Sequence, residues 1–373
     1  MPVIGEFILP EDPRWKRYLD VNWHDFYHRP EYALLCARNE GGTAAAFYGQ
    51  GRGASFLAPL VIRQIPHPLN QDLYDCSSPY GYSTPLVGPT QEQLPAFLDA
   101  FLKCAKDHRI VTAFFRLHPF LELNKEDLGR FGQIVHHGQT VYIDLSLSDE
   151  VFWSQVRRNH RQNIHKLSQL GFEVRLDDWS LLREFAPMYR ETMSRVGAHT
   201  CLYSEPYFEE LKAMLGESMH LCCVLSSDGQ VVAGGIFVET AGIVHYHLSA
   251  TATEFLRFGP NKLIVTFVRA WAQQRYNKVL HLGGGVAGQY DSLFHFKAGF
   301  SEARANFYTY RMIVDQHQYE TLSRSVDGHA GVRASTPSVY FPAYRRPPAQ
   351  GILSGLQHLP EKQEAQAGVS HLP

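Results

Sequence analysis

The stretch IVHYHLSATATEFLRFGPNKLIVTFVRAWAQQRYNKVLHLGGGVAGQYDSLFHFKAGF, residues 243–300, carries the signals that decide the fold. It begins with an apolar strand over 243–250, and a polar loop then leads to Pro260. The helix that follows has apolar side chains at helical spacing. A second strand over 278–282 ends in three glycines. A strand, a loop and a helix opened by proline form a turn whose free backbone N–H groups favour a phosphate.

The composition is that of a folded, charge-balanced chain. Of the 373 residues, 45% are hydrophobic and 19% are charged, and the formal net charge is −2. The near-neutral balance gives no global attraction to nucleic acid, so a polyanionic partner must meet a local basic patch. The 6 cysteines have no CxxC pair and no metal-binding spacing, so we expect reduced and mostly buried thiols.

The N-terminus lacks the basic segment and apolar core of a signal peptide, and no run approaches about 18 apolar residues. We therefore expect a soluble, cytoplasmic protein without a transmembrane segment, and leave a peripheral position at a membrane open. We expect two domains, 1–150 and 151–320, and an extension over 321–373 where helix and strand signals fade. Its tail from residue 357 is expected to be disordered, whereas VYFPAYR at 339–345 is aromatic enough to pack back on a domain.

Helix and strand signals alternate outward from the opening stretch. In the first part we expect a short helix at 26–35, strands at 43–48 and 54–63, a helix at 91–107, and strands at 111–117 and 140–145. In the second part we expect helices at 151–170, 180–195 and 206–215, a strand at 172–176, a hairpin of 220–226 with 230–239, and a last strand at 306–314. This mixed order predicts the α/β (α+β) class, with mixed sheets flanked by helices.

The predicted helix at 151–170 is basic on its outer circumference. No acidic residue occurs from 151 to 172, while the outer circumference carries five basic residues: Arg157, Arg158, Arg161, His165 and Lys166. One interpretation is a solvated helix face. The other is a helix that contacts phosphates, which the absence of acidic neighbours favours in an otherwise balanced chain.

Several segments resemble a known family. They are RRNHRQNIHKL (157–167), GFEVR (171–175), FGPNKLI (258–264), LHLGGG (280–285), FKAGF (296–300) and, in the first half, SPYGYSTPL (78–86). The element order from 172 onward is that of GNAT-type N-acyltransferases, and the segments resemble Fem-type (FemABX-like) aminoacyltransferases of that superfamily over roughly 20–315. The coiled-coil arm of some members has no counterpart here.

The resemblance implies two GNAT-like domains and an enzyme, an acyltransferase. It implies transfer of an aminoacyl group from aminoacyl-tRNA, the co-substrate, to an amine of a peptidoglycan precursor in cell-wall biogenesis or of a small peptide, without a bound cofactor. The alternative is a GNAT N-acyltransferase that uses acetyl-CoA or another acyl-CoA. A second alternative is a non-catalytic binding protein that keeps the fold.

Acyl transfer from a reactive ester needs an aimed amine, a stabilised oxyanion and a proton acceptor, but no catalytic triad. Lys297 matches the lysine of the family's FK-x-x-F segment, which the resemblance links to aminoacyl-tRNA use. Its cation can hold a donor phosphate or the oxyanion, or it is a surface lysine at a strand edge. Asp291 can orient an amine or accept a proton, or serve as a turn or cap residue. Tyr290 is a weaker companion as a substrate-binding residue.

The loop before the opening stretch's helix is the candidate donor-binding segment. Arg257, Gly259, Asn261 and Lys262 stand where GNAT enzymes place R/Q-x-x-G-x-G/A, the loop that cradles the coenzyme A pyrophosphate. Only Arg257 and Gly259 match that pattern. The missing second glycine leaves less room for close backbone approach, which weakens the coenzyme A interpretation.

Three histidines of the opening stretch invite a zinc hypothesis. His245 and His247 share one strand face, and His281 is expected on a neighbouring strand. No carboxylate or cysteine completes a ligand set at recognisable spacing, and the reaction needs no metal, so we predict none. His247 is retained as a candidate that lines the substrate site.

Four further residues are candidates for substrate binding. Tyr80 and Tyr82 can stack on a sugar or ring of the acceptor, or be buried with hydrogen-bonded hydroxyls. Arg195 and Tyr203 lie between two predicted helices, where GNAT folds shape the acceptor pocket. Arg158 and Arg161 of the basic helix are the candidates for contact with the donor's phosphates.

Overall fold

The computed structural model describes residues 3–66, 72–198, 203–330 and 340–346. Contacts divide the chain into two units, 1–318 and 319–373, and each is described by itself. Among the described helices, none is long and apolar enough to cross a bilayer. Five cysteines of the described part are free, four of them buried, while Cys201 lies outside it.

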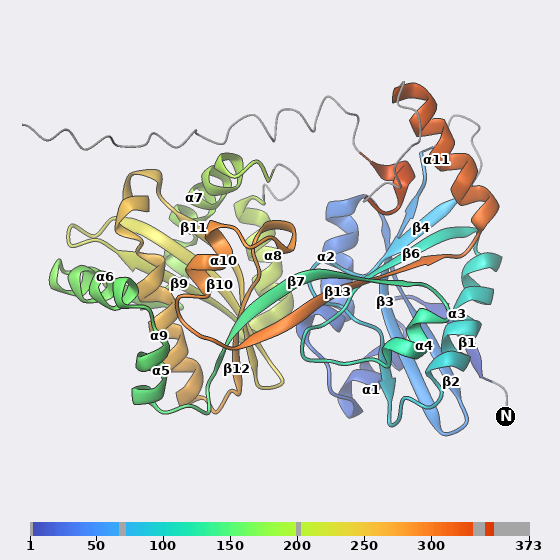
Figure 1. Ribbon diagram of the computed structural model, residues 1–373, viewed down its shortest axis with the longest axis horizontal. Helices are drawn as coiled ribbons and strands as arrows, with labels where there is room; N and C mark the ends of the chain where they lie inside the picture. Colours follow the sequence, from blue (N-terminus) through green and yellow to red (C-terminus); the bar gives the residue numbers. More distant parts are fainter. Residues whose placement is uncertain (1–2, 67–71, 199–202, 331–339, 347–373) are drawn as a thin grey trace, which may run out of the picture. The chain divides into compact units, whose positions relative to one another are not determined.

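The first part of unit 1 contains strands and helices up to residue 144 (Figure 1). They are β1 (Ile4–Ile8), α1 (Pro13–Val21), η1 (Phe26–His28), α2 (Pro30–Glu40), β2 (Thr43–Gly51), β3 (Ala54–Gln64), β4 (Tyr74–Ser77), β5 (Leu86–Gly88), α3 (Leu94–Asp107), β6 (Ile110–Arg116), α4 (Lys125–Gly129) and β7 (Gln133–Asp144). Proline opens α2 and Gly41, at φ +66°, ends it, which are the favoured residues at those positions.

The second part follows the element order expected from the opening stretch. Its helices are α5 (Asp149–Gln155), α6 (Arg158–Gln169), η2 (Trp179–Leu181), α7 (Leu182–Arg195), α8 (Glu205–Leu215), η4 (Gly216–Ser218), η5 (Thr253–Phe258), α9 (Asn261–Gln274), η6 (Val286–Gly288) and α10 (Ser292–Lys297). Its strands are β8 (Glu173–Leu176), β9 (Met219–Leu225), β10 (Val231–Thr240), β11 (Ile243–Thr251), β12 (Val279–Gly283) and β13 (Arg304–Ile313).

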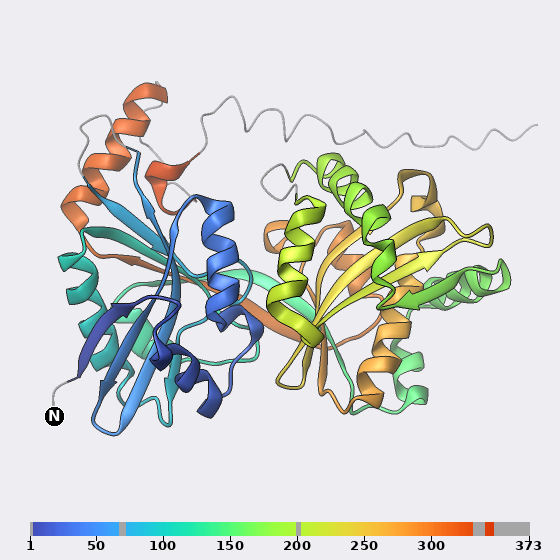
Figure 2. The same ribbon diagram turned by 180° about the vertical axis from the view of Figure 1, so that it is seen from behind.

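The described strands form one mixed sheet. Its order is β1-β2-β3-β4-β6-β13-β7-β12-β11-β10-β9-β8, and β5 pairs with β3. The last strand, β13, lies between β6 and β7, so it joins the strands of the first part to those of the second (Figures 1 and 2). The predicted class, α/β with a mixed sheet flanked by helices, is confirmed.

Three apolar cores hold the helices to this sheet. The first contains side chains of α1, α2, α7 and α8, and α2 contacts α8 across the two parts. The second lies beneath α5, α6, α9 and α10, and the third beneath α3 and α4. The first core holds Phe26 and Tyr27, next to residue 25, together with Ala250 of β11, so these distant segments share one interior.

The pairing of β11 with β12 positions the candidate site. The two strands are parallel, and their register pairs Ile243 with Val279, Val244 with Leu280 and His245 with His281. No described pair follows His245–His281, although β11 continues to Thr251. On its other edge β12 pairs with β7, where the register shifts between His281 and Gly283. The strands therefore separate just beyond the two histidines.

The prediction of one helix over 151–170 is wrong, because the segment forms α5 and α6 with a break at Val156 and Arg157. Ser148 caps α5 by accepting from Val151 N–H, but Val156 is extended (φ −65°, ψ 126°). The N–H of Arg157 leaves the helical pattern and donates to Gly299 O at 2.9 Å. This tertiary bond competes with helix continuation and turns the basic helix α6 away from α5.

Two further expectations need correction. A short helix, α10, follows the glycine run and η6. Lys297 is therefore the last residue of a helix, and the alternative of a surface lysine at a strand edge is wrong. The helix α11 (Gln316–Ala330) lies where signals were expected to fade. In the first part the expected helix at 26–35 is η1 followed by α2, while β1, α1, β4, β5 and α4 were not predicted.

Unit 2 contains most of α11 and the short helix η7 (Ala343–Arg345). The ring of Tyr319 lies 6.0 Å from that of Phe341 and 5.9 Å from that of Tyr344. Residues 340–345 of the aromatic segment therefore pack on α11 within their own unit. Val339 and the predicted disordered tail lie outside the described residues.

Candidate active site

Lys297 is placed at the end of α10, directly against the glycine turn. Its Nζ donates to Gly284 O at 2.7 Å. Burial disfavours the charged ammonium and lowers the pKa of Lys297 to about 8, although the attraction of Asp291 opposes that shift. Lys297 is thus a partly buried amine whose pKa lies close to neutral pH, as expected of a lysine with a chemical role.

Asp291 caps α10. One carboxylate oxygen accepts from Phe294 N–H at 2.8 Å, and the other accepts from Val286 N–H at 2.9 Å. Each oxygen therefore has a backbone donor, which fits the cap role that was left open beside the proton-acceptor role. Tyr290, which is 55% exposed, lies edge-on to Phe294 at 4.6 Å, outside the cluster around Lys297.

Tyr82 comes from the first part of the chain and reaches the glycine turn. A Cβ placed on Gly283, which has φ +77°, would lie 3.3 Å from Lys297 Nζ and 3.8 Å from Tyr82 Oη. Tyr82 also lies 5.1 Å from the ring of His281. The structure thus brings Tyr82, Lys297 and His281 together. Tyr80 does not join them: it is 43% exposed and lies under the guanidinium of Arg116 at 5.5 Å.

A buried cluster of histidines surrounds one carboxylate. Oδ2 of Asp25, in the residue that caps η1, lies 2.8 Å from His118 Nε2 and 2.5 Å from His245 Nε2. His245 Nδ1 in turn lies 3.2 Å from His281 Nδ1. These four side chains come from the N-cap of η1, from the segment after β6, and from β11 and β12, and none is more than 3% exposed.

Burial, charge and hydrogen bonding shift the pKa values of Asp25 and His281 in this cluster. Burial raises the pKa of Asp25, but the attraction of His245 and the hydrogen bonds from His118 and His245 outweigh it and hold that pKa below its usual value. Burial, followed by the charges of His245, His118 and Lys297, lowers the pKa of His281. Its Nε2 has no hydrogen-bond partner among the described residues. His281 is therefore a neutral imidazole with one unused ring nitrogen.

His247 is half-buried and lies among aromatic rings. Its ring lies 5.4 Å from Phe26, 6.1 Å from Tyr27 and 6.3 Å from Tyr32. Burial, with the charge of His245, lowers the pKa of His247 to about 3. His247 therefore lies among aromatic rings next to the cluster, at the point where β11 separates from β12.

The Asp25, His118 and His245 ligand atoms lie within 4.8 Å of one another, the one such group found among the described residues. The carboxylate was missed by sequence because Asp25 lies 220 residues from His245. Zinc ligands at about 2.0–2.1 Å in a tetrahedron stand roughly 3.3 Å apart. The distances of 2.5 and 2.8 Å from Oδ2 to the two Nε2 atoms are shorter and have hydrogen-bond lengths. The donor set therefore fits shared protons better than a zinc ion.

The predicted donor loop forms the start of α9. Gly259 has φ +60°, and a Cβ there would lie 2.5 Å from Lys262 Nζ. Lys262 Nζ donates to Asn163 Oδ1 at 3.1 Å, and burial lowers the pKa of Lys262. Asn261 Nδ2 donates to Thr251 Oγ1 at 2.7 Å. Arg257 is exposed and stacks on Phe258 at 4.8 Å.

The backbone N–H groups of this start are partly used. Lys262 N–H donates to Gly259 O at 3.1 Å and Leu263 N–H donates to Pro260 O at 2.9 Å. Such 3₁₀-type bonds satisfy donors that a pyrophosphate would otherwise take. The start of α9 therefore offers an anion fewer free N–H donors than the sequence pattern indicates.

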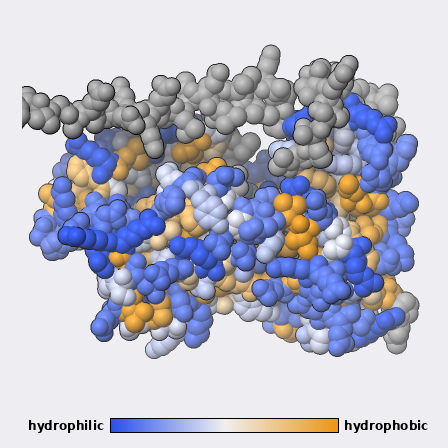
Figure 3. Space-filling view, in the orientation of Figure 1, coloured by the Kyte–Doolittle hydropathy of each residue, from blue (hydrophilic) through white to orange (hydrophobic). Residues whose placement is uncertain are grey.

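The basic helix α6 presents its charges outward. Arg158, Arg161, His165 and Lys166 are all exposed, and Arg161 also donates to Trp153 O at 2.8 Å. The space-filling view is strongly hydrophilic over this helix (Figure 3). Through Asn163 the helix is bonded to Lys262, so its basic face continues to the start of α9.

Arg195 and Tyr203 lie away from the histidine cluster. Arg195 donates to Thr253 Oγ1 at 2.7 Å and to Thr251 O at 3.2 Å, so it ties α7 to the end of β11. Tyr203 stacks on Tyr207 at 3.9 Å and on Tyr189 at 6.1 Å. The sequence therefore identified a helix–strand tie and an aromatic stack here, rather than side chains that meet Lys297.

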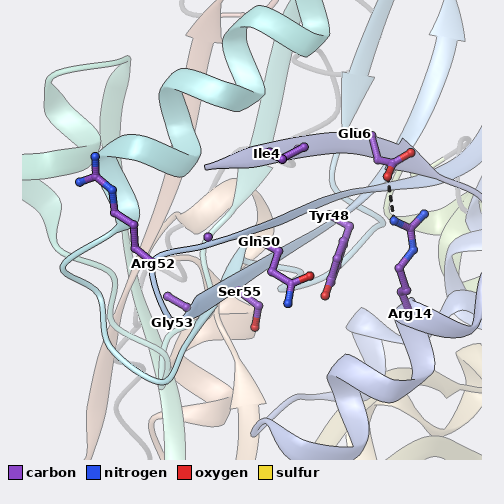
Figure 4. A pocket seen from close by; sticks show the side chains of 11 residues that line it. Ile4, Glu6, Arg14, Tyr48, Gln50, Arg52, Gly53 and Ser55 are labelled. Carbon is purple, nitrogen blue, oxygen red and sulfur yellow. Dashed lines mark hydrogen bonds and ion pairs between the residues drawn. The ribbon is translucent and has the colours of Figure 1, made fainter. Parts of the chain in front are cut away.

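A separate hollow of about 670 Å³ lies on the first part of the sheet, at the edge strand β1 (Figure 4). Its lining includes Glu6, Arg14 and Gln50, and Arg14 pairs with Glu6 at 2.7 Å. None of the predicted site residues lines it. Because its charged groups pair with each other, we do not assign the site to it.

Asp25 and His118 were missed by sequence reasoning. Each stands in a largely aromatic or apolar segment, WHDFYH and RLHPF, without a motif of its own. The aromatic density around Asp25 was the one available signal, because a carboxylate flanked by Trp23, Phe26 and Tyr27 requires a buried partner.

Comparison with known proteins finds a matching domain and similar folds. Residues 154–297 match the model of the acetyltransferase (GNAT) domain. No curated protein matches the chain. A crystal structure of FemX is similar with a TM-score of 0.64 at 15% identity, covering 85% of this chain and 99% of that chain. The structure of L-PGS from Bacillus licheniformis is similar with a TM-score of 0.54 at 13% identity, covering 86% and 96%.

At these identities the two structures show a shared fold. The matched domain spans α6, the strands β8–β12, the start of α9 and Lys297, so it contains most of the predicted donor side of the site. The acetyltransferase domain, in this fold, makes the chain an acyltransferase.

Proposed function

We propose that the chain transfers an aminoacyl group from aminoacyl-tRNA to an amine of a peptidoglycan precursor or a small peptide, in the cytoplasm. The observation that carries the choice of donor is the exposed, acid-free face of α6, which continues to Lys262. Aminoacyl-tRNA is a polyanion, and binding to phosphates requires a local cluster of basic side chains. A chain with a net charge of −2 concentrates those side chains at this helix.

The start of α9 supports the same choice. A coenzyme A pyrophosphate needs free N–H groups and close backbone approach. Here Lys262 and Leu263 N–H groups bond within their own turn, and Lys262 Nζ occupies the space beside Gly259. A nucleic acid can instead be held by side-chain cations over a wider surface.

The alternative donor is acetyl-CoA or another acyl-CoA. The match of residues 154–297 to an acetyltransferase domain favours it, together with the left-handed Gly259 in the position of a GNAT phosphate loop. Acyl-CoA would then lie where β11 and β12 separate, beside His247. The rings of Phe26 and Tyr27 pack against His247, so less space is left for acyl-CoA between the two strands there.

The proposed reaction uses Lys297 at the carbonyl. Its Nζ donates one proton to Gly284 O, which leaves two N–H bonds for the oxygen of the donor ester. A partly desolvated cation stabilises the oxyanion that forms when the amine attacks. Tyr82 Oη, beside the same glycine turn, can orient the acceptor.

The donor is tested with the purified full chain, a panel of amines, and either charged tRNA or acetyl-CoA. We expect amide product from charged tRNA that disappears when RNase is added first. Thiol release from acetyl-CoA with no effect of RNase contradicts the tRNA donor. Binding of an amine without turnover from either donor supports a non-catalytic protein instead.

The contact with tRNA is tested by salt dependence. Replacing Arg158 and Arg161 with alanine should reduce the slope of log Kd against log salt by about 1–2, because each lost phosphate contact removes roughly 0.7–0.9. The matched control is Arg183→Ala with Arg190→Ala, two exposed arginines of α7. An unchanged slope in the α6 variant would mean that this helix is a solvated face without contact to phosphates.

A further inference from the structure

The unused nitrogen of His281 is the feature that the proposed reaction has not explained. His281 is 1% exposed, and its Nε2 has no partner among the described residues. A buried polar atom without a partner is unfavourable, and native structures keep such atoms mainly where a ligand or a reaction uses them. Its ring lies 5.1 Å from Tyr82, beside Lys297.

The hydrogen bonds restrict which ring nitrogens can carry the protons. Asp25 Oδ2 can only accept, so His118 and His245 both donate to it from Nε2. His118 Nδ1 then accepts from Phe120 N–H at 3.1 Å. His245 donates to Asp25 through Nε2, so its Nδ1 is the ring atom that can accept, and we assign the proton between the two Nδ1 atoms to His281. His281 Nε2 is therefore a base.

We propose that His281, His245 and Asp25 form a proton relay in which His281 Nε2 accepts the proton released by the attacking amine. This inference rests on the acyl transfer proposed above. His281 is the catalytic base, because it touches the reacting nitrogen, while His245 and Asp25 are positioning residues. His118 holds the second N–H bond to Asp25.

The proton balance is complete without a further reactant. The amine lone pair attacks the donor carbonyl carbon, so a C–N bond forms and the C–O bond breaks with its electron pair on the leaving oxygen. The amine proton passes to His281 Nε2, while the His281 Nδ1 proton passes to His245 Nδ1. The imidazolium then stands beside the Asp25 carboxylate. Reversal of these transfers returns one proton to the leaving oxygen, which gives an alcohol and an amide.

The surroundings explain why the base stays neutral. His281 is faced by His245 and His118, by the cation of Lys297 and, across His245, by Asp25. Burial and the three basic neighbours disfavour a second proton on His281, while Asp25 favours it. Lys297 and Tyr82 are partly buried, whereas the histidines and Asp25 are buried, so the proposed reaction requires the amine to approach on the side of Lys297 and Tyr82.

The relay is tested with His281→Gln and Asp25→Asn in the full chain. A matched control is His220→Gln, because His220 is a buried histidine bonded to Asp177 at 2.9 Å elsewhere in the sheet. Loss of a general base lowers kcat by about 10²–10⁴-fold. We expect that loss for both relay variants, with KM for the donor changed by less than about threefold and the acid limb of the pH profile removed in His281→Gln.

Histidine ¹⁵N NMR of the full chain provides a second measurement that needs no donor. We expect His281 to carry its proton on Nδ1 and His245 on Nε2, assigned from the signals lost in His281→Gln and His245→Gln. A proton on His281 Nε2, or a metal ion that copurifies and broadens these signals, overturns the relay. An active wild type with an equally active His281→Gln overturns the relay alone. A wild type inactive with both donors overturns the proposed function and the relay with it.

Discussion

The buried centre around Asp25 and the start of α9 around Gly259 differ in how their polar groups are satisfied: by buried side-chain partners in the first, and by local backbone bonds and solvent in the second. In the centre Asp25, His118 and His245 are 0–3% exposed and bond to one another and to neighbouring protein groups. At the start of α9 the backbone bonds within its own turn, and the neighbouring Arg257 faces solvent. Water can replace a lost partner at the second place, but not at the first.

The difference separates where the sequence carries a motif from where the chemistry is concentrated. The start of α9 resembles a phosphate loop, yet much of its hydrogen-bonding capacity is used locally. The centre carries no motif, yet it keeps an unused base beside a partly buried lysine. Substitutions should therefore have large effects in the centre and small effects at the start of α9.

The largest effect is expected from Asp25→Asn on stability. Both carboxylate oxygens of Asp25 accept from N–H groups, and asparagine would replace one of them with an NH₂ group that cannot accept. The resulting pair of opposed donors should lower the free energy of unfolding by about 3 kcal/mol. The control is Asp177→Asn, whose side chain is 39% exposed and which should lose about 1 kcal/mol or less. Urea unfolding of both variants measures the difference, and equal losses contradict the contrast between buried and hydrated pairs.

Lys297→Met should stabilise the protein while it abolishes transfer. The pKa of Lys297 is lowered to about 8 from 10.5, so the folded protein disfavours the charged form that the unfolded chain prefers. Between pH 8 and 10.5 the unfolded state binds more protons, and wild-type stability rises with pH. The variant should be more stable by on the order of 2 kcal/mol at pH 7, and this gain should fade toward pH 10.5.

Lys262→Met is the comparison at the start of α9. Burial also lowers the pKa of Lys262, but its Nζ donates to Asn163, a bond that methionine loses. We expect a smaller gain or none from chemical denaturation at pH 7. A Lys297→Met gain that persists unchanged at pH 10.5 shows that the lysine charge is not its origin.

His247→Phe should reduce sensitivity to acid. The pKa of His247 is lowered to about 3 by burial, so below its ordinary pKa of 6.5 the unfolded chain takes up a proton that the folded chain does not. Wild-type stability therefore falls as the pH drops below 6.5. Between pH 7 and 5.5 the variant should lose about 1 kcal/mol less than wild type in urea titrations. Parallel pH curves for the two proteins contradict this assignment.

The elements of the opening stretch could be predicted because hydrophobic periodicity is local. The strands near 243–250 and 278–282 and the helix between them were predicted and are present as β11, β12 and α9. The break at Val156 could not be predicted, because its cause is a bond from Arg157 N–H to Gly299, far along the chain. Local patterns contain no information on such a partner.

The candidate site shows the same limit. Lys297, Tyr82 and the neighbourhood of His245 and His281 were singled out from sequence, and the structure brings them together. Asp25 was missed, since only the packing of α2 against α8 and the sheet brings it to His245. Arg195 and Tyr203 were chosen by position alone and lie in other contacts.

The smallest effect is expected from Gly259→Ala. At φ +60° alanine costs about 1 kcal/mol, and its Cβ would stand 2.5 Å from Lys262 Nζ, the mobile end of a side chain that can move aside. Gly41→Ala is the matched control, because Gly41 has φ +66° and nothing within 4 Å of the added Cβ. We expect similar stability losses in the two variants and less than about a twofold change in KM for charged tRNA.

The same pair of variants decides whether the start of α9 holds the donor. If a pyrophosphate approached the backbone at Gly259, a methyl group there would block it, and KM for acyl-CoA would rise about tenfold or more in Gly259→Ala but not in Gly41→Ala. That result would move the donor site to the start of α9 and reverse the contrast with the centre. Unchanged kinetics in both variants keep the chemistry beside Lys297 and His281.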